Sequence, residues 1–129
     1  MVTSRDQLLV RYRELVLDRL PRRGREEGWV VHLDHCVGRV VLDNAVGGAW
    51  RTLVPAGRGP AFTRLDDAQL GRAVDLAERM DAEGAALVAD LDARSLTWRG
   101  KAPRRAPRPP AAGSGAGTVA TSAPSAGAR

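Results

Sequence analysis

Apolar side chains recur three or four residues apart along most of the first 100 residues, and stretches rich in glycine or proline separate these runs. This spacing places the apolar positions on one face of an α-helix. It predicts four helices, which begin near Ser4, near Asp34, at Asp66 and after Gly84. A short extended connector over residues 29–33 is expected to lead into the second of them.

The first predicted helix has a start signal and a proline near its end. Ser4 and Gln7 form the S-x-x-Q pattern of a capping box. Pro21 is expected to end or kink the helix, because proline lacks the N–H group. The residues after it can form a second short helical segment that ends at Gly28. The apolar positions of the first helix are Leu8, Leu9, Tyr12, Leu15, Val16 and Leu20.

Residues 34–50, DHCVGRVVLDNAVGGAW, are apolar around most of a helical circumference and therefore predict a buried central helix. Asp34 is expected to cap its N-terminus, and Gly47 with Gly48 fits its C-terminal end. Gly38 costs such a helix about 1 kcal/mol relative to alanine. The alternative is a β-hairpin, because VVHLD and RVVLD are rich in valine, although HCVG is a poor hairpin turn. The apolar side comprises Val37, Val40, Val41, Leu42, Ala45, Val46 and Ala49, with Asn44 among them.

Two further helices follow the loop PAGRGP. Asp66 and Gln69 form a second capping box, and Gly100 is expected to end the last helix. The expected core positions are Leu70, Ala73, Val74, Ala77 and Met80 in the third helix, and Leu87, Val88, Leu91 and Trp98 in the fourth. The fold class is therefore all-α, a compact bundle of about four helices over residues 1–100.

Residues 101–129 differ in composition, being rich in proline, alanine, glycine and serine. They have almost no large apolar side chains, so burial cannot offset their chain entropy, and we expect a disordered tail. The tail holds five of the 20 basic residues and no acidic one, which leaves 15 basic and 15 acidic residues in the first 99. A neutral folded part argues against a dedicated nucleic-acid reader, and only weak association through the basic tail is expected.

The remaining composition bounds the location of the protein. The single cysteine cannot form an internal disulfide, which suits a reducing cytoplasm. A run of 18 apolar residues does not occur, so the sequence predicts no membrane span. The first residues, MVTSRDQLLV, lack the pattern of a secretory signal. We therefore expect a cytoplasmic protein, and a residual apolar face could support a homodimer.

The central helix also carries the residues with the most distinctive chemistry. Cys36 falls in its predicted first turn, where the helix dipole favours a thiolate, and His35 is adjacent. These two are the candidate catalytic residues. The structural alternative is a buried cysteine that packs as a small apolar group, with Arg39 and Asp43 paired at i,i+4 within the helix.

A candidate ligand-binding face follows from the stripe of Cys36, Arg39, Asp43 and Trp50 on the central helix. Arg99 near the end of the fourth helix is a further candidate anion contact. The full candidate binding set is Asp34, Arg39, Asp43, Asn44, Trp50, Trp98 and Arg99. The spacing of His32, Asp34, His35 and Cys36 matches no standard zinc pattern, so no metal is expected.

The arrangement DHC-x-x-R-x-x-LDN-x-x-GG-x-W, then LDDAQL-x-x-A-x-x-LAERM, then SL-x-WRGK, resembles a small group of bacterial proteins. The resemblance covers nearly all of the first 100 residues. Members of that group are mostly uncharacterised, and some carry an acetyltransferase label. The resemblance therefore implies acetyl-CoA as a cofactor only where that activity holds. The R/Q-x-x-G-x-G/A loop shared by acetyltransferases of the common coenzyme-A-binding fold is missing from this sequence.

The first functional interpretation is a small helical domain that binds a protein partner or a small ligand, without a cofactor, at the face of Cys36, Arg39 and Asp43. The alternative is an acyltransferase, or another enzyme, centred on His35 and Cys36. A third interpretation is non-specific nucleic-acid association through the tail.

Overall fold

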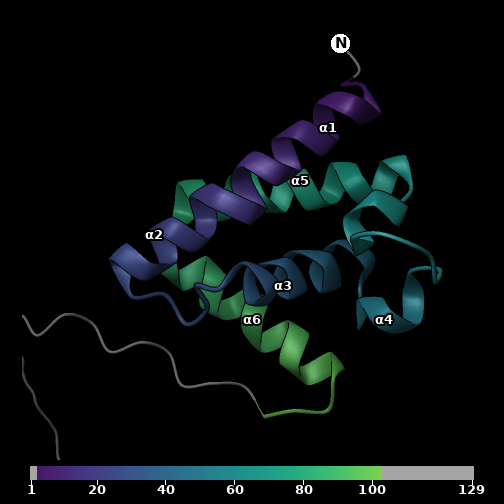
Figure 1. Cartoon of the computed structure of the whole chain (residues 1–129). Helices are drawn as coiled ribbons and strands as arrows, with labels where there is room; N and C mark the ends of the chain where they lie inside the picture. Colours follow the sequence, from purple (N-terminus) through teal and green to yellow (C-terminus); the bar gives the residue numbers. More distant parts are fainter. Residues whose placement is uncertain (1–2, 103–129) are drawn as a thin grey trace, which may run out of the picture.

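The computed structural model describes residues 3–102, and within this range all regular structure is helical (Figure 1). This confirms the predicted all-α bundle and excludes the hairpin alternative for the central segment. The predicted disordered tail lies outside the described residues except for its first two residues, 101 and 102. The elements are α1 (Arg5–Tyr12), the π-helix η1 (Arg13–Arg19), α2 (Leu20–Glu27), α3 (Asp34–Val46), α4 (Trp50–Leu53), the 3₁₀-helix η2 (Ala61–Arg64), α5 (Asp67–Glu83) and α6 (Ala85–Trp98).

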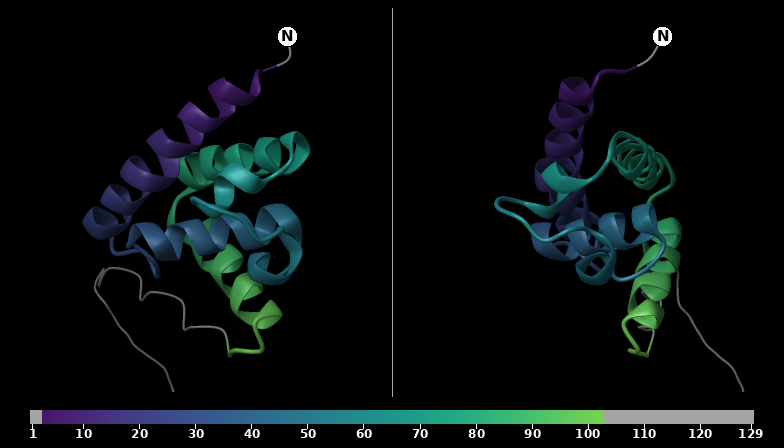
Figure 2. Two further views of the ribbon diagram at one scale, coloured as in Figure 1. Left: turned by 45° about the vertical axis from the view of Figure 1, so that its right-hand side comes forward. Right: turned by 90° about the vertical axis from the view of Figure 1, so that its right-hand side faces the viewer.

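The elements α1, η1 and α2 run on as one rod (Figures 1 and 2). Ser4 and Gln7 form the predicted capping box at its start, and Gly28, with φ +71°, ends it as predicted. Pro21 neither ends nor interrupts the rod but lies in the first turn of α2. The π-helix before it explains this, because a wider turn makes room for the proline ring and leaves the Leu20 amide bonded to the Leu15 carbonyl.

The helix α3 lies at the centre of the molecule and contacts η1, α2, α4, α5 and α6. Figure 2 shows the rod and α5 on one side of it and α6 on the other. Val37, Val40 and Val41 are fully buried, as the apolar pattern predicted. One detail was wrong: Leu33, not Asp34, is the N-cap. The Asp34 carboxylate instead accepts a bond from the adjacent His35 amide at 2.8 Å.

The ends of α5 and α6 largely follow the sequence signals. Asp66 and Gln69 form the second capping box. Gly100 ends α6 in a Schellman motif, in which the Lys101 amide donates to the Leu96 carbonyl at 2.8 Å. The prediction of Trp98 as a core residue was wrong, since it is 41% exposed. It lies in the last turn of α6, which extends beyond the rest of the bundle (Figure 2).

Within residues 3–102, no helix has both the length and the apolar composition needed to cross a membrane.

Candidate ligand-binding groove

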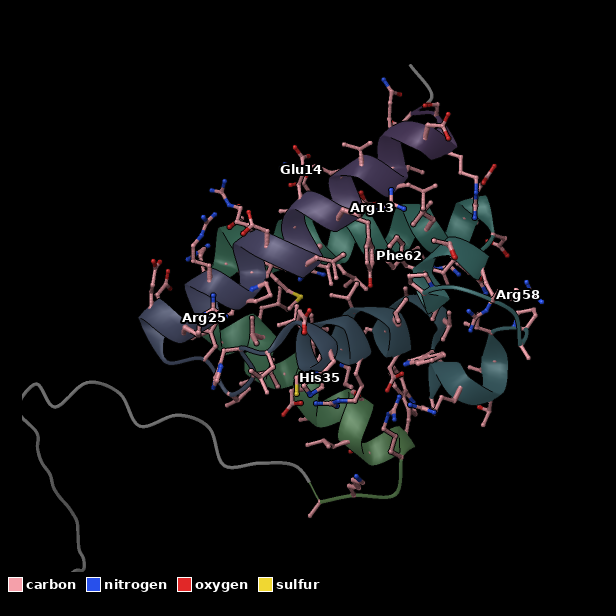
Figure 3. The ribbon with its side chains drawn as sticks, viewed as in Figure 1. Arg13, Glu14, Arg25, His35, Arg58 and Phe62 are labelled. Carbon is pink, nitrogen blue, oxygen red and sulfur yellow. The ribbon has the colours of Figure 1, made fainter. Side chains whose placement is uncertain are left out.

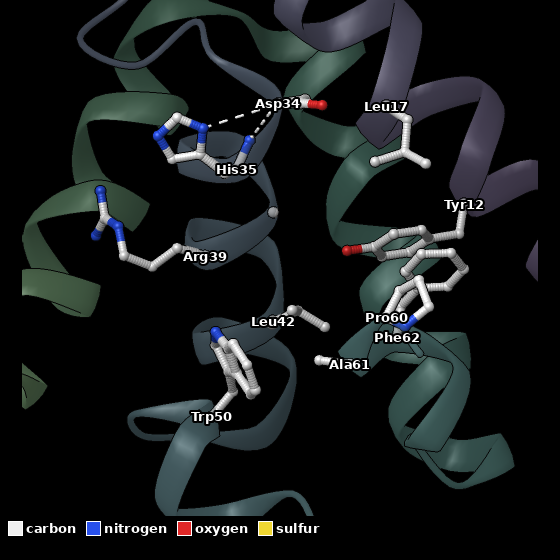
Figure 4. Close-up of a pocket in the computed structure, with 11 residues that line it drawn as sticks. Tyr12, Leu17, Asp34, His35, Arg39, Leu42, Trp50, Pro60, Ala61 and Phe62 are labelled. Atoms are coloured by element: carbon white, nitrogen blue, oxygen red, sulfur yellow. Dashed lines mark hydrogen bonds and ion pairs between the residues drawn. The ribbon is translucent and has the colours of Figure 1, made fainter. Parts of the chain in front are cut away.

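A groove of about 310 Å³ lies over one face of α3 (Figure 4). Its floor is α3, one wall comes from the end of α1, η1 and η2, and the other comes from α4 and the outer edge of α3. The aromatic, charged and polar lining residues are Tyr12, Asp34, His35, Arg39, Trp50 and Phe62, and small or aliphatic side chains complete the surface. An apolar groove with a few polar groups is typical of small-molecule sites.

The aromatic wall is a stacked pair of rings. Tyr12 at the end of α1 and Phe62 in η2 have ring centroids 4.4 Å apart and an interplanar angle of 20°. The Tyr12 side chain is almost fully buried, yet its hydroxyl points toward α3 and into the groove (Figure 4). This hydroxyl has no hydrogen-bond partner among residues 3–102. Burial raises the pKa of Tyr12, so the phenol stays protonated and can donate a hydrogen bond.

Gly38 forms the floor opposite the Tyr12 hydroxyl. A Cβ atom at this position would lie 3.9 Å from Tyr12 Oη, and no other atom would come within 4 Å of it. The backbone of Gly38 is ordinary helix with negative φ, so neither turn geometry nor close packing requires glycine here. The missing side chain leaves open space in the groove.

The polar wall is anchored to α6 through Arg39. Its Nη1 donates to Ser95 Oγ at 2.6 Å, and its Nη2 donates to Asp92 Oδ1 at 2.7 Å. Ser95 and Asp92 are both buried. Two buried acceptors therefore fix the guanidinium along the side of the groove (Figure 4).

Asp43 lies behind this wall, fully buried, and joins three elements. Arg99 binds it in a bidentate fashion at 2.7 and 3.0 Å, and Ser95 Oγ donates to it at 2.7 Å. The Trp50 backbone amide donates to the same carboxylate at 2.9 Å. Burial alone would raise the pKa of Asp43, but the bonds from Arg99, Ser95 and the Trp50 amide outweigh it and hold that pKa below its usual value.

The sequence-predicted binding residues fall into three groups. Asp34, Arg39 and Trp50 line the groove, together with the candidate catalytic residue His35. Asp43 and Arg99 form the support behind it. Asn44 and Trp98 lie away from the groove: Asn44 Nδ2 donates to the carbonyls of Val40 at 2.8 Å and Leu91 at 3.0 Å.

The i,i+4 spacing allowed an ion pair between Arg39 and Asp43. In its place Arg39 pairs with Asp92 of α6, and Asp43 pairs with Arg99 at the end of α6. Sequence reasoning missed Asp92 and Ser95, which are i,i+3 on α6. Two polar residues at helical spacing on an otherwise apolar face are a signal for such partners. It also missed Tyr12 and Phe62 as groove residues; Tyr12 was predicted only as core.

Cys36, the second candidate catalytic residue, packs partly buried against the core and is not among the residues that line the groove. His35 is exposed at the groove edge, where its Nδ1 lies 3.7 Å from Asp34 Oδ1. Neighbouring helical residues point about 100° apart, which explains why these two do not share one cavity. No group of three or more metal-ligating side chains occurs within residues 3–102.

Comparison of the chain with protein-family models, with curated proteins and with solved structures finds no match.

Proposed function

We propose that this protein is a small-molecule-binding domain whose site is the groove over α3. The observation that carries the proposal is the Tyr12 hydroxyl, which faces the groove without a protein partner while the ring that carries it is buried. A hydrogen-bonding group held in a fixed position inside a mainly apolar groove is what orients a small ligand. This arrangement favours a ligand site over a passive surface hollow.

The surroundings of the groove support this function, because they hold both walls in place. Arg39 is fixed by Asp92 and Ser95, and the start of α4 is fixed by the bond from Trp50 to Asp43. Walls that are already ordered lower the entropic cost of binding. The π-helix η1 follows Tyr12 directly and borders the groove through Leu17, and such segments occur frequently at functional sites.

The size of the groove favours a small molecule over an extended protein partner. Its volume of about 310 Å³ is near the lower end of the range for small-molecule pockets. The acyltransferase interpretation has less support, since His35 faces the groove and Cys36 packs against the core.

A titration with a planar aromatic probe tests the proposal. We expect 2-naphthoate to shift the backbone amide signals of Gly38, Trp50 and Phe62 in isotope-labelled protein, with a dissociation constant of about 0.05–1 mM. Gly38→Leu fills the groove floor and should abolish these shifts. Gly71→Leu is the matched control, because Gly71 is a helical glycine in α5 whose Cβ would meet open space. Shifts that map elsewhere, or that survive Gly38→Leu, would contradict the proposed site.

A further inference from the structure

Two hydrogen-bond donors face the groove from opposite walls. The Tyr12 hydroxyl faces it, and Trp50 Nε1 lies on the opposite wall without a partner among residues 3–102. An indole N–H can only donate, and a protonated phenol can donate as well as accept. A ligand with acceptor oxygens can therefore pair with either group.

Two arginines add positive charge to the aromatic walls. Arg13 Cζ lies 5.3 Å from the Phe62 ring centroid, and Arg51 Cζ lies 5.2 Å from the Trp50 ring centroid. Figure 3 shows Arg13 beside Phe62. Neither arginine forms an ion pair with a carboxylate among the described residues. Each cation is thus held against a ring that lines the groove while its charge stays uncompensated.

The negative charge near the groove is smaller. Asp34 is the one carboxylate that lines it, and one of its oxygens already accepts from the His35 amide at 2.8 Å. The charge of Arg39 is matched by Asp92, 2.7 Å away. The two arginines beside the aromatic rings therefore bring more positive charge than the single lining carboxylate brings negative charge. The surroundings of the groove have a net positive charge.

Resting on the proposed function of this groove, we infer that its ligands are small planar aromatic oxyanions, with carboxylates as the committed class. The ring lies on the apolar surface of Leu42, against the edge of Phe62, whose ring is already covered by Tyr12 and Arg13. The carboxylate accepts from Tyr12 or Trp50. The charges of Arg13 and Arg51 attract it from the rim. Interactions with exposed cations are individually weak, so selectivity arises from the donors and the charges together.

Two probes of the same shape test the inference. 2-Naphthoate and 2-naphthamide differ by one charge, and both are titrated into the full chain by calorimetry and by amide shifts. We expect naphthoate to bind about five- to tenfold more tightly at low salt, and about twofold more tightly in high salt, where screening weakens the rim charges. Tyr12→Phe keeps the stacked ring and should lower naphthoate affinity by about three- to tenfold.

Charge variants localise the effect. Arg13→Gln/Arg51→Gln should lower naphthoate affinity by about three- to tenfold and leave naphthamide unchanged. Arg25→Gln/Arg94→Gln is the matched control, because it removes the same net charge from exposed arginines outside the groove. The inference would be overturned if naphthamide bound as tightly as naphthoate, or if both double variants lost the same amount of naphthoate affinity. Either result would leave the groove as a binding site. If neither probe binds at the groove, the proposed function itself fails.

Discussion

At the scale of single residues, the molecule depends most on one buried carboxylate. Asp43 is fully buried but accepts four hydrogen bonds from three different residues. Its partner Arg99 keeps about 20% of its side chain exposed. A buried charge is tolerated when every lone pair is satisfied, but removal of one partner is strongly destabilising. Asp43 thereby ties α3, α4 and the end of α6 to one another.

We predict that Asp43→Asn lowers the free energy of unfolding by about 2–3 kcal/mol at pH 7, somewhat less than for a fully buried pair because Arg99 reaches water. The folded-state pKa of Asp43 lies below its unfolded value of 3.8. The contribution of the charge is therefore fully present above that value and is lost as pH falls through the folded pKa. Urea unfolding should show a smaller difference in the free energy of unfolding between wild type and variant at about pH 3 than at about pH 5. At the higher pH the carboxylate contributes fully, and at the lower pH it contributes only in part.

Glu83→Gln is the control for this prediction, because it removes one partner of the exposed Arg79–Glu83 pair, whose closest atoms lie 3.0 Å apart. Its cost should stay below about 0.5 kcal/mol. A difference for Asp43→Asn that is the same at both pH values would show that packing, and not the ionised carboxylate, carries the effect.

At the scale of elements, glycines inside helices have opposite roles. A Cβ on Gly24 in α2 would lie 2.8 Å from the Val31 carbonyl and 2.9 Å from His32 Cβ, so glycine lets the rod contact the connector into α3. Gly38 in α3 and Gly71 in α5 have no such contact. At these two positions the packing of the fold does not require glycine, which lowers helix propensity.

We predict that Gly24→Ala destabilises the protein by about 1–3 kcal/mol, since backbone must move to relieve the contact. Gly38→Ala and Gly71→Ala should each stabilise it by up to about 1 kcal/mol. Thermal or urea unfolding of the three variants measures both signs. Of the two stabilised variants, only Gly38→Ala should weaken binding of 2-naphthoate, because its methyl group enters the groove. Stabilisation by Gly24→Ala would show that the connector does not pack as described.

Helix existence and most helix ends were predictable because their causes are local. The capping boxes at Ser4 and Asp66 and the end at Gly47 each depend on a few neighbouring residues. The π-helix η1 and the 3₁₀-helix η2 were not predicted, since neither has a comparable local pattern. Trp98 shows a further limit, because helical spacing places a side chain on a face but does not show how far the neighbouring helices extend.

The groove could be predicted only along residues 34–50, which supply its floor and Trp50. Helical spacing identified Arg39 and Asp43 as polar exceptions in an apolar helix, but it assigned them to each other. Their partners lie more than 50 residues away on α6. The stacked wall of Tyr12 and Phe62 joins residues from two elements whose contact depends on tertiary packing. Residues brought together across elements are beyond what the period of a single helix can show.

At the scale of the whole molecule, most of the excess positive charge lies in a different part of the chain from the buried apolar core. The buried apolar residues all lie between Tyr12 and Leu96 in the described range. Four of the 20 basic residues lie in 103–129, and removal of that segment leaves 16 basic and 15 acidic residues, a net charge of +1. Fold stability and electrostatic attraction to polyanions should therefore separate on truncation.

We predict that a chain ending at Ala102 keeps the unfolding midpoint of the full chain, because the sequence of the removed segment has almost no large apolar side chains. It should also lose association with a short labelled DNA duplex, measured by fluorescence anisotropy. For the full chain, the logarithm of the binding constant should fall with the logarithm of salt concentration with a slope no steeper than about −4, since each phosphate contact contributes about −0.9. Undiminished, salt-insensitive binding by the truncated chain would place a nucleic-acid site on the helical part. A lower midpoint would instead show that residues 103–129 pack against it.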